Sequence, residues 1–280
     1  ISAQSMGIAQ AAYSEAVKYA SEREQFGKTI DQIPAVKKML DFMEREVAAM
    51  RSMGYEAART IDLYAWRQHH LEKEGVDERK IKKDEQIRYW EKMANFMTPL
   101  TKYYTSEMCN RIAYDALQIH GGSGYTEDYD VARIYRDARI TNIYEGTTQM
   151  QMHAAIGGLT AGMSPTGHVR QYIDNMLTKF EPSELLQELR TALETAIELY
   201  RNLADTETRE TNAFEAVETM ARFINTMLME CSAARISDAD VRDHRRELAR
   251  AYAVDSLAIA QANLIKLKIA PAAGPVLATA

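Results

Sequence analysis

Cysteine, proline and glycine are all scarce in this sequence, and each scarcity narrows the range of folds. The chain has 280 residues with 2 Cys, 6 Pro and 13 Gly. Cys109 and Cys231 lie far apart, each on an apolar helical stripe, so we expect buried free thiols and no disulfide framework. Long stretches pass without Gly or Pro, which implies few connections and long elements. With no convincing strand pattern, the sequence predicts an all-α fold.

Concentrated positive charge and long apolar runs are also missing. The net charge is -6, and basic residues are interleaved with acidic ones, so we expect no nucleic-acid partner. No apolar run has membrane-spanning length, which predicts a soluble protein. The histidines lack the spacing with Glu that seats zinc on a helix, and the pair His69 and His70 is interpreted as a surface pair. We therefore expect no metal site.

Apolar residues recur at spacings of three and four, which predicts long amphipathic helices. The first group forms an antiparallel four-helix-bundle domain over residues 1–158, with helices at the amino-terminus, over 35–68, 84–119 and 128–140, and a last one ending near Gly157 and Gly158. Small residues between 159 and 167 mark the expected boundary. A second helical unit, 168–280, has helices near 168–180, 183–203, 208–235 and 238–269. Because the chain begins at Ile1 inside a helical pattern, we expect it to be part of a longer protein.

Three loops of the first bundle combine glycine with groups suited to a nucleotide. In residues 23–27, the Arg23 guanidinium either clamps a pyrophosphate or is simply solvated. In residues 118–124, Gly121 and Gly122 either let the backbone approach a phosphate closely or end the preceding helix.

The third loop, residues 144–149, carries Glu145. In one interpretation, Thr147 or Thr148 caps the next helix and the Glu145 charge favours its positive end. In the other, the carboxylate reaches into a cavity, where desolvation raises its pKa toward that of a general base. Spacing alone leaves both open.

Taken together and in this order, four segments resemble the acyl-CoA dehydrogenase family: REQFGK at 23–28, QIHGGSGY at 118–125, RDAR at 136–139 and IYEGTTQ at 143–149. The match spans residues 1 to about 158, the family's carboxy-terminal helical domain. The resemblance implies an FAD enzyme that desaturates an acyl-CoA thioester between its α and β carbons. Glu145 is then the base that removes the α proton, while the β hydrogen leaves as hydride to the flavin. The residues implied to bind are Gly146 at the thioester, Thr147 and Gln149 at the FAD, and Arg23, Gln25, Gln118, Gly121 and Gly122 at the FAD of a neighbouring subunit.

The resemblance also implies partners and a setting. We expect a homodimer or homotetramer, an electron-transferring flavoprotein as electron acceptor, and a location in the bacterial cytoplasm or the mitochondrial matrix. The family's amino-terminal and middle domains are absent, so the isolated chain is expected to be inactive. The alternatives are an acyl-CoA oxidase-like flavoprotein and a non-catalytic helical interaction module. For residues 168–280 we expect packing against its own or a neighbouring subunit, with membrane-surface binding through amphipathic helices and the apolar tail after Lys268 as the alternative.

Overall fold

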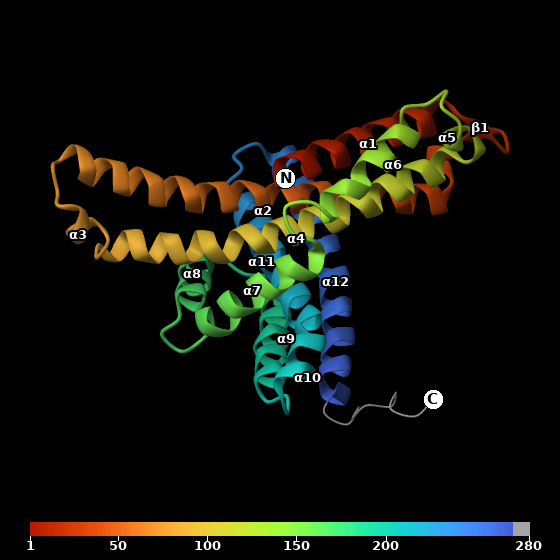
Figure 1. The fold of residues 1–280 in the computed structure, drawn as a ribbon. Helices are drawn as coiled ribbons and strands as arrows, with labels where there is room; N and C mark the ends of the chain where they lie inside the picture. The colour runs from red at the N-terminus through yellow and green to blue at the C-terminus, as the bar shows by residue number, and fades with distance from the viewer. Residues whose placement is uncertain (271–280) are drawn as a thin grey trace. The chain divides into compact units, whose positions relative to one another are not determined.

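The computed structural model describes residues 1–270, which are helical almost throughout (Figure 1). Residues 271–280, most of the expected apolar tail and the end of the expected second unit, lie outside the described residues. The all-α prediction is confirmed, and Cys109 and Cys231 are free and buried as expected. Contacts group the chain into two compact units, one formed by residues 1–54 and 101–151 and the other by residues 55–100 and the chain from Met152 onward. These boundaries fall inside three helices, so the expected division between 158 and 168 remains a prediction.

The first unit contains all of the predicted site residues. Its elements, in chain order, are α1 (Ser2–Glu22), β1 (Glu24–Gln25), β2 (Lys28–Thr29), the 3-10 helix η1 (Ile30–Gln32), the start of α2 (Pro34–Lys73), the end of α4 (Glu85–His120), α5 (Gly122–Tyr125), α6 (Val131–Ala138), the 3-10 helix η2 (Arg139–Asn142) and the start of α7 (Thr148–Gly162). The helix α1 packs against α6. The helix α1 carries a fully buried stripe of small side chains, which allows neighbouring elements to approach it closely; the stripe consists of Ala9, Ala12, Ala16 and Ala20.

A buried polar pair crosses the interior of this unit. The Tyr104 hydroxyl on α4 donates a hydrogen bond of 2.5 Å to a Glu46 carboxylate oxygen on α2. Both side chains are at least 98% buried. Because a buried carboxylate must be hydrogen-bonded to be tolerated, this contact fixes how α2 and α4 pair inside the unit.

The second unit is built mainly from the carboxy-terminal helices. It contains the end of α2, α3 (Glu78–Ile81), the start of α4, the rest of α7, α8 (His168–Leu177), α9 (Glu184–Arg201), α10 (Thr206–Thr211), α11 (Ala213–Ala233) and α12 (Ala239–Ile269). The helices α9, α11 and α12 pack on one another (Figure 1). In α11 most residues are buried, including Arg222 and Asn225, so it forms the interior of this group.

Two further contacts hold the second unit together. Leu71, Ile81 and Ile87 form a small apolar cluster around α3. On α2, Glu56 accepts hydrogen bonds from Tyr172 at 2.6 Å and from the Arg59 Nε at 2.8 Å. This buried carboxylate is therefore fully paired, and it ties α8 to α2.

The helix bounds differ from the expected ones at identifiable positions. The helix α7 continues through Gly157 and Gly158 to Gly162. A Cβ at Gly158 would lie 3.2 Å from Phe96, so this glycine serves close packing and does not end the helix. The expected helix 208–235 is two helices, since α10 starts at its own cap, where the Asp205 carboxylate accepts from the Thr208 N–H. The expectation of no strand is wrong for a single hairpin, β1 and β2.

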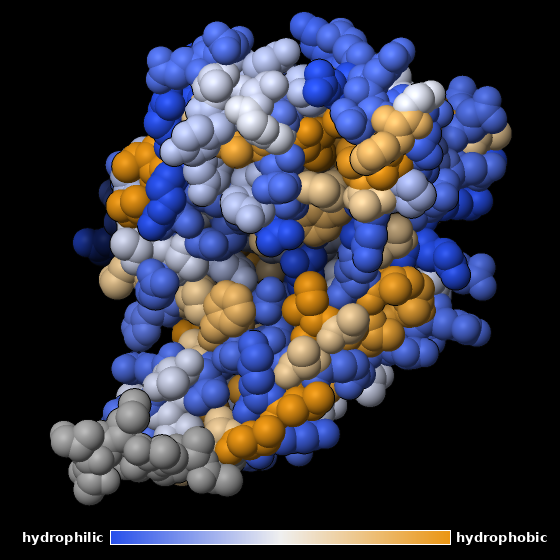
Figure 2. Space-filling view, turned by 90° about the vertical axis from the view of Figure 1, so that its right-hand side faces the viewer, coloured by the Kyte–Doolittle hydropathy of each residue, from blue (hydrophilic) through white to orange (hydrophobic). Residues whose placement is uncertain are grey.

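Exposed apolar side chains are distributed over the surface. Figure 2 shows one face, on which hydrophobic side chains form several separate groups between hydrophilic ones. The exposed large apolar residues of α12 are Val241, Val254, Ile265 and Ile269. Within residues 1–270, no helix combines the length and hydropathy needed to cross a membrane.

Candidate active site

The turn between η2 and α7 has a backbone conformation that few residues adopt. Glu145 has a φ of 54° and Gly146 a φ of 90°. Positive φ is uncommon for a residue that has a side chain, and at two successive positions it requires support from the surroundings. A Cβ at Gly146 would also lie 2.6 Å from the Gln151 amide nitrogen. Glycine is therefore favoured at 146, since any other residue would be strained at this φ and would displace the Gln151 side chain, and Glu145 is held in a strained conformation.

Three side-chain hydrogen bonds, from two helices, hold this turn. The Gln151 side-chain amide on α7 donates to the Glu145 carbonyl at 2.8 Å. From α4, the Lys102 ammonium donates to the Gly146 carbonyl, and Glu107 accepts from the Thr148 hydroxyl. Burial lowers the pKa of Lys102 from its usual value, and the Glu107 charge opposes that shift. The turn is thus fixed by two helices of the first unit.

The side chain of Glu145 is exposed. Residues 1–270 therefore do not supply the desolvation expected for a general base at this position. Of the other predicted residues here, Thr147 and Gln149 are exposed and Gly146 is partly exposed. Thr148 is buried, and its hydroxyl faces Glu107 instead of capping α7.

Arg23 ends α1 as its C-cap residue, and Gln25 lies on the first strand of the short β-hairpin that follows directly. Gln25 pairs with Lys28, and the two connecting residues, Phe26 and Gly27, have φ of 55° and 75°. Positive φ at both positions matches the tight hairpin turn whose twist suits antiparallel strands. The turn pushes the Phe26 ring into solvent, where it is 86% exposed. Arg23 and Gln25 are exposed beside it, so a cation, an amide and an aromatic face are presented together.

Gln118, Gly121 and Gly122 lie at the carboxy-terminal end of α4. Gly121 has a φ of 59°, and its N–H donates to the Gln118 carbonyl at 3.1 Å, so it does end the helix. A Cβ at either glycine would meet nothing within 4 Å. The backbone here is open to an approaching ligand as well as serving as a cap, and the two interpretations of this loop are compatible.

An aromatic cluster joins these two loops. The His120 ring stacks on Tyr19 of α1 at 4.3 Å between centroids, and Tyr129 packs edge-on against both rings. His120 is 2% exposed, and its Nδ1 lies 2.8 Å from the Ala116 carbonyl. Burial lowers the pKa of His120. The hairpin and the glycine loop are therefore parts of one surface at the carboxy-terminal ends of α1 and α4.

The Glu145 turn lies at the other end of α1. The Tyr144 hydroxyl donates to the Gln4 side chain in the first turn of that helix. From Gln4 to Arg23 the helix rises by roughly 28 Å, at about 1.5 Å per residue. The structure thus brings together Arg23, Gln25, Gln118, Gly121 and Gly122, and it keeps them apart from Glu145 of the same chain.

Three residues near these loops were not singled out from the sequence. Lys102 and Glu107 lie on a long helix whose pattern only indicates burial on one face, and no local signal links them to residue 146 or 148. Phe26 sits inside the REQFGK segment, where the only turn signal is the neighbouring Gly27.

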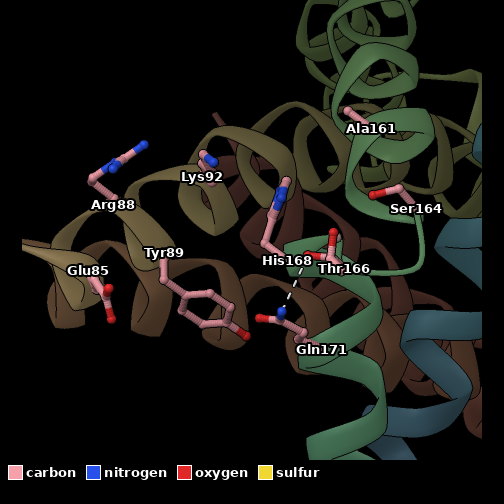
Figure 3. A pocket seen from close by; sticks show the side chains of 10 residues that line it. Glu85, Arg88, Tyr89, Lys92, Ala161, Ser164, Thr166, His168 and Gln171 are labelled. Atoms are coloured by element: carbon pink, nitrogen blue, oxygen red, sulfur yellow. Dashed lines mark hydrogen bonds between the residues drawn. The ribbon is translucent and has the colours of Figure 1, made fainter.

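The second unit contains a separate hollow of about 480 Å³ (Figure 3). Its lining includes Arg88, Lys92 and His168, and Gln171 donates to the Thr166 carbonyl at 3.3 Å. Burial and the Lys92 charge lower the pKa of His168. All its lining residues belong to the second unit, so it is not part of the loops described above. As expected, His69 and His70 are exposed. Separately, the described part of the chain contains no cluster of three or more His, Cys, Asp and Glu side chains suited to a metal ion.

Among curated proteins, three bacterial relatives illustrate the similarity. The CarC subunit of the caffeyl-CoA reductase–Etf complex of Acetobacterium woodii is 37% identical over 159 residues, which is 57% of this chain and 35% of that protein. A 3-(aryl)acrylate reductase of Clostridium sporogenes is 37% identical over 151 residues, covering 54% of this chain and 33% of that protein. The short-chain-specific acyl-CoA dehydrogenase of Megasphaera elsdenii is 34% identical over 159 residues, 57% of this chain and 34% of that protein. This chain thus spans about a third of the length of these relatives.

Two solved structures share the fold over nearly the whole chain. An acyl-CoA dehydrogenase from Bacillus anthracis, complexed with FAD, superposes with a TM-score of 0.74 at 19% identity over 95% of this chain and 47% of that one. Acyl-CoA oxidase 1 of Yarrowia lipolytica gives a TM-score of 0.80 at 20% identity, over 96% of this chain and 44% of that one. The sequence profile of the acyl-CoA dehydrogenase carboxy-terminal domain matches residues 1–68 and 87–158, and the chain therefore belongs to the acyl-CoA dehydrogenase family.

Proposed function

We propose that this chain is the carboxy-terminal part of an FAD-dependent acyl-CoA dehydrogenase and that Glu145 is its catalytic base. The observation that carries the proposal is the strained turn at Glu145 and Gly146. Strain at a residue that has a side chain persists only where the surrounding structure supports it, and it is concentrated at functional sites. In a member of this family, a carboxylate placed on such a turn is best explained as a group that must point at a substrate.

The chemistry needs a base held at a fixed position. The α proton of a thioester is only weakly acidic, so a carboxylate must be aligned with the C–H bond as the enolate forms. Bound acyl-CoA and flavin would cover Glu145 and supply the desolvation that the chain itself does not. Bound FAD would accept the β hydrogen as hydride. Gly146 has no side chain, so its backbone stays accessible to the thioester.

The residues at the other end of α1 fit a flavin nucleotide. The exposed Arg23 makes no ion pair within residues 1–270, and a guanidinium suits a pyrophosphate. Gly121 and Gly122 offer an open backbone, Gln25 and Gln118 offer amides, and Phe26 offers a ring face. Because α1 separates this surface from Glu145 by roughly 28 Å at about 1.5 Å per residue, we propose that it binds the FAD of a neighbouring subunit in a homodimer or homotetramer. Thr147 and Gln149, on the exposed side of the turn, are proposed to contact the FAD next to Glu145.

The test uses the full-length protein. It is expected to bind FAD, and the flavin absorbance should bleach when an acyl-CoA is added without oxygen. Glu145→Gln should keep the FAD and lose the bleaching, whereas Glu91→Gln, an exposed Glu on α4, should bleach like the wild type. Full bleaching in Glu145→Gln would refute the role of Glu145, and a protein that binds no FAD would indicate a non-catalytic helical module.

The direction of the reaction is a separate question, because two of the similar relatives are named as reductases. In that direction Glu145 would return a proton to the α carbon of an enoyl-CoA. Mixing pre-reduced enzyme with an enoyl-CoA and following reoxidation of the flavin measures it. Oxygen consumption during turnover would instead support the oxidase alternative. The relative named as part of a reductase–Etf complex supports an electron-transferring flavoprotein as the partner.

The chain beyond residue 158 lies outside the family match. We propose that it packs within its own or a neighbouring subunit, because the apolar faces of α9, α11 and α12 are turned toward one another. Membrane-surface binding is tested by co-sedimentation of the full-length protein with liposomes, and sedimentation with the lipid would favour it.

A further inference from the structure

Lys102 is a buried cation that contacts the proposed catalytic turn. It lies on α4 with 5% of its surface exposed, and its Nζ donates to the Gly146 carbonyl oxygen. Within residues 1–270 it makes no ion pair. Burying an ammonium group with one acceptor is costly, and a position that only fills space is better occupied by an apolar side chain. The hydrogen bond from Lys102 to the Gly146 carbonyl therefore explains why a lysine occupies this buried position.

Glu107 makes the matching contact from the same helix. It lies just over one turn after Lys102, and its carboxylate accepts from the Thr148 hydroxyl and, at 3.1 Å, from the Asn142 side-chain amide. Together, Lys102 and Glu107 hold the segment 142–148 before, within and after its left-handed part. A charge-assisted hydrogen bond is stronger than a neutral one, so both contacts resist relaxation of the turn to an unstrained conformation.

We propose that Lys102 is a positioning residue: its ammonium holds the Gly146 carbonyl and thereby fixes the turn from which Glu145 reaches the substrate. The proposal rests on the proposed role of Glu145. Lys102 acts through the backbone of Gly146 and does not itself touch the reacting atoms. Loss of its hydrogen bond should release the turn, misplace the Glu145 carboxylate and slow proton removal, while binding of acyl-CoA changes little.

The first experiment compares Lys102→Met with Lys92→Met in the full-length FAD-loaded protein. Met keeps the length of the side chain and removes the donor, and Lys92 is an exposed lysine on the same helix. A misplacement of about 1 Å in a reacting group can cost about 100-fold. We expect the rate constant for flavin bleaching at saturating acyl-CoA to fall by about 10- to 100-fold in Lys102→Met, with a KM within about threefold of the wild type. Lys92→Met should not differ from the wild type. An unchanged rate in folded Lys102→Met would overturn the proposal.

The second experiment measures amide hydrogen exchange of residues 143–148 in the same proteins and does not depend on turnover. We expect exchange at least about tenfold faster in Lys102→Met, with α1 unchanged, since local opening follows the loss of anchoring contacts. If the wild type fails to bleach but the turn still loosens, the proposed function is wrong and the anchoring contact stands. If the wild type bleaches and the turn exchanges equally in both, the anchoring role is wrong. Should Lys102→Met not fold, Lys102→Arg keeps a donor with altered geometry, and it must lower the rate with wild-type FAD content for the proposal to survive.

Discussion

Replacing Gly146 by alanine tests the strained turn most directly. An alanine in the left-handed region costs about 1–2 kcal/mol. Its Cβ would lie 2.6 Å from the Gln151 amide nitrogen, so that side chain must move and lose its hydrogen bond to the Glu145 carbonyl, worth about 0.5–1 kcal/mol. The sum is about 1.5–3 kcal/mol, which reduces the population of the native turn about 10- to 150-fold at about 1.4 kcal/mol per factor of ten.

The assay is the kcat/KM of the full-length enzyme with a saturated acyl-CoA, and we expect it to fall by a similar factor. Two variants separate the contributions. Gln151→Leu removes only the hydrogen bond and should cost about two- to fivefold. Gly157→Ala places the same methyl group on α7, where a Cβ meets nothing within 4 Å, and should be neutral or slightly stabilising. A Gly146→Ala enzyme within about threefold of the wild type would show that the turn conformation does not matter to the reaction.

Two further predictions concern stability. Tyr172→Phe removes the 2.6 Å hydrogen bond to the buried Glu56 carboxylate while Arg59 remains, so the free energy of unfolding in urea should fall by about 1.5–3 kcal/mol. The control is Tyr125→Phe, which should leave the free energy of unfolding unchanged because Tyr125 is 84% exposed. Equal values for the two variants would contradict the assigned hydrogen bond between Tyr172 and Glu56. Burial lowers the pKa of His120 below its unfolded value of 6.5. As the pH falls through 6.5, the unfolded chain therefore takes up a proton that the folded chain does not. The free energy of unfolding should then decrease by up to about 1.4 kcal/mol per pH unit. Urea unfolding between pH 7.5 and 5 should show a smaller decrease in His120→Phe, and an identical pH dependence would refute this assignment.

The sequence predicted the long helices well, because their apolar positions repeat with the helical period over many turns. The prediction of helix ends was wrong where glycine, which can end a helix, instead allows close packing within one. In the sequence, Gly157 and Gly158 indicate a helix end, whereas in the structure the missing side chain of Gly158 accommodates Phe96. The segment around Phe26 and Gly27 indicates only a loop, since two-residue strands carry no periodicity.

The sequence predicts the site residues that lie in local motifs, but not those whose partners lie far along the chain. Glu145, Arg23 and the glycines were found because they lie in local motifs whose order matches a family. Lys102 and Glu107 were missed, because their partners lie far along the chain and their spacing on α4 shows only that one face is buried. The exposure of Glu145 was also not foreseen, since the sequence gives no information on which surfaces need a ligand or a second chain to be covered.

The length of α1 sets the distance between the turn that carries Glu145 and the hairpin that follows Arg23. Tyr144 is attached to its first turn, and the hairpin follows its last. One inserted residue would turn the hairpin by about 100° and advance it about 1.5 Å relative to the catalytic turn. A change of about seven residues, close to two full turns, would nearly restore the direction in which the hairpin faces, and it would still displace the hairpin by about 10 Å. Evolution of such a chain is therefore expected to vary the surface of this helix freely while leaving its residue count fixed.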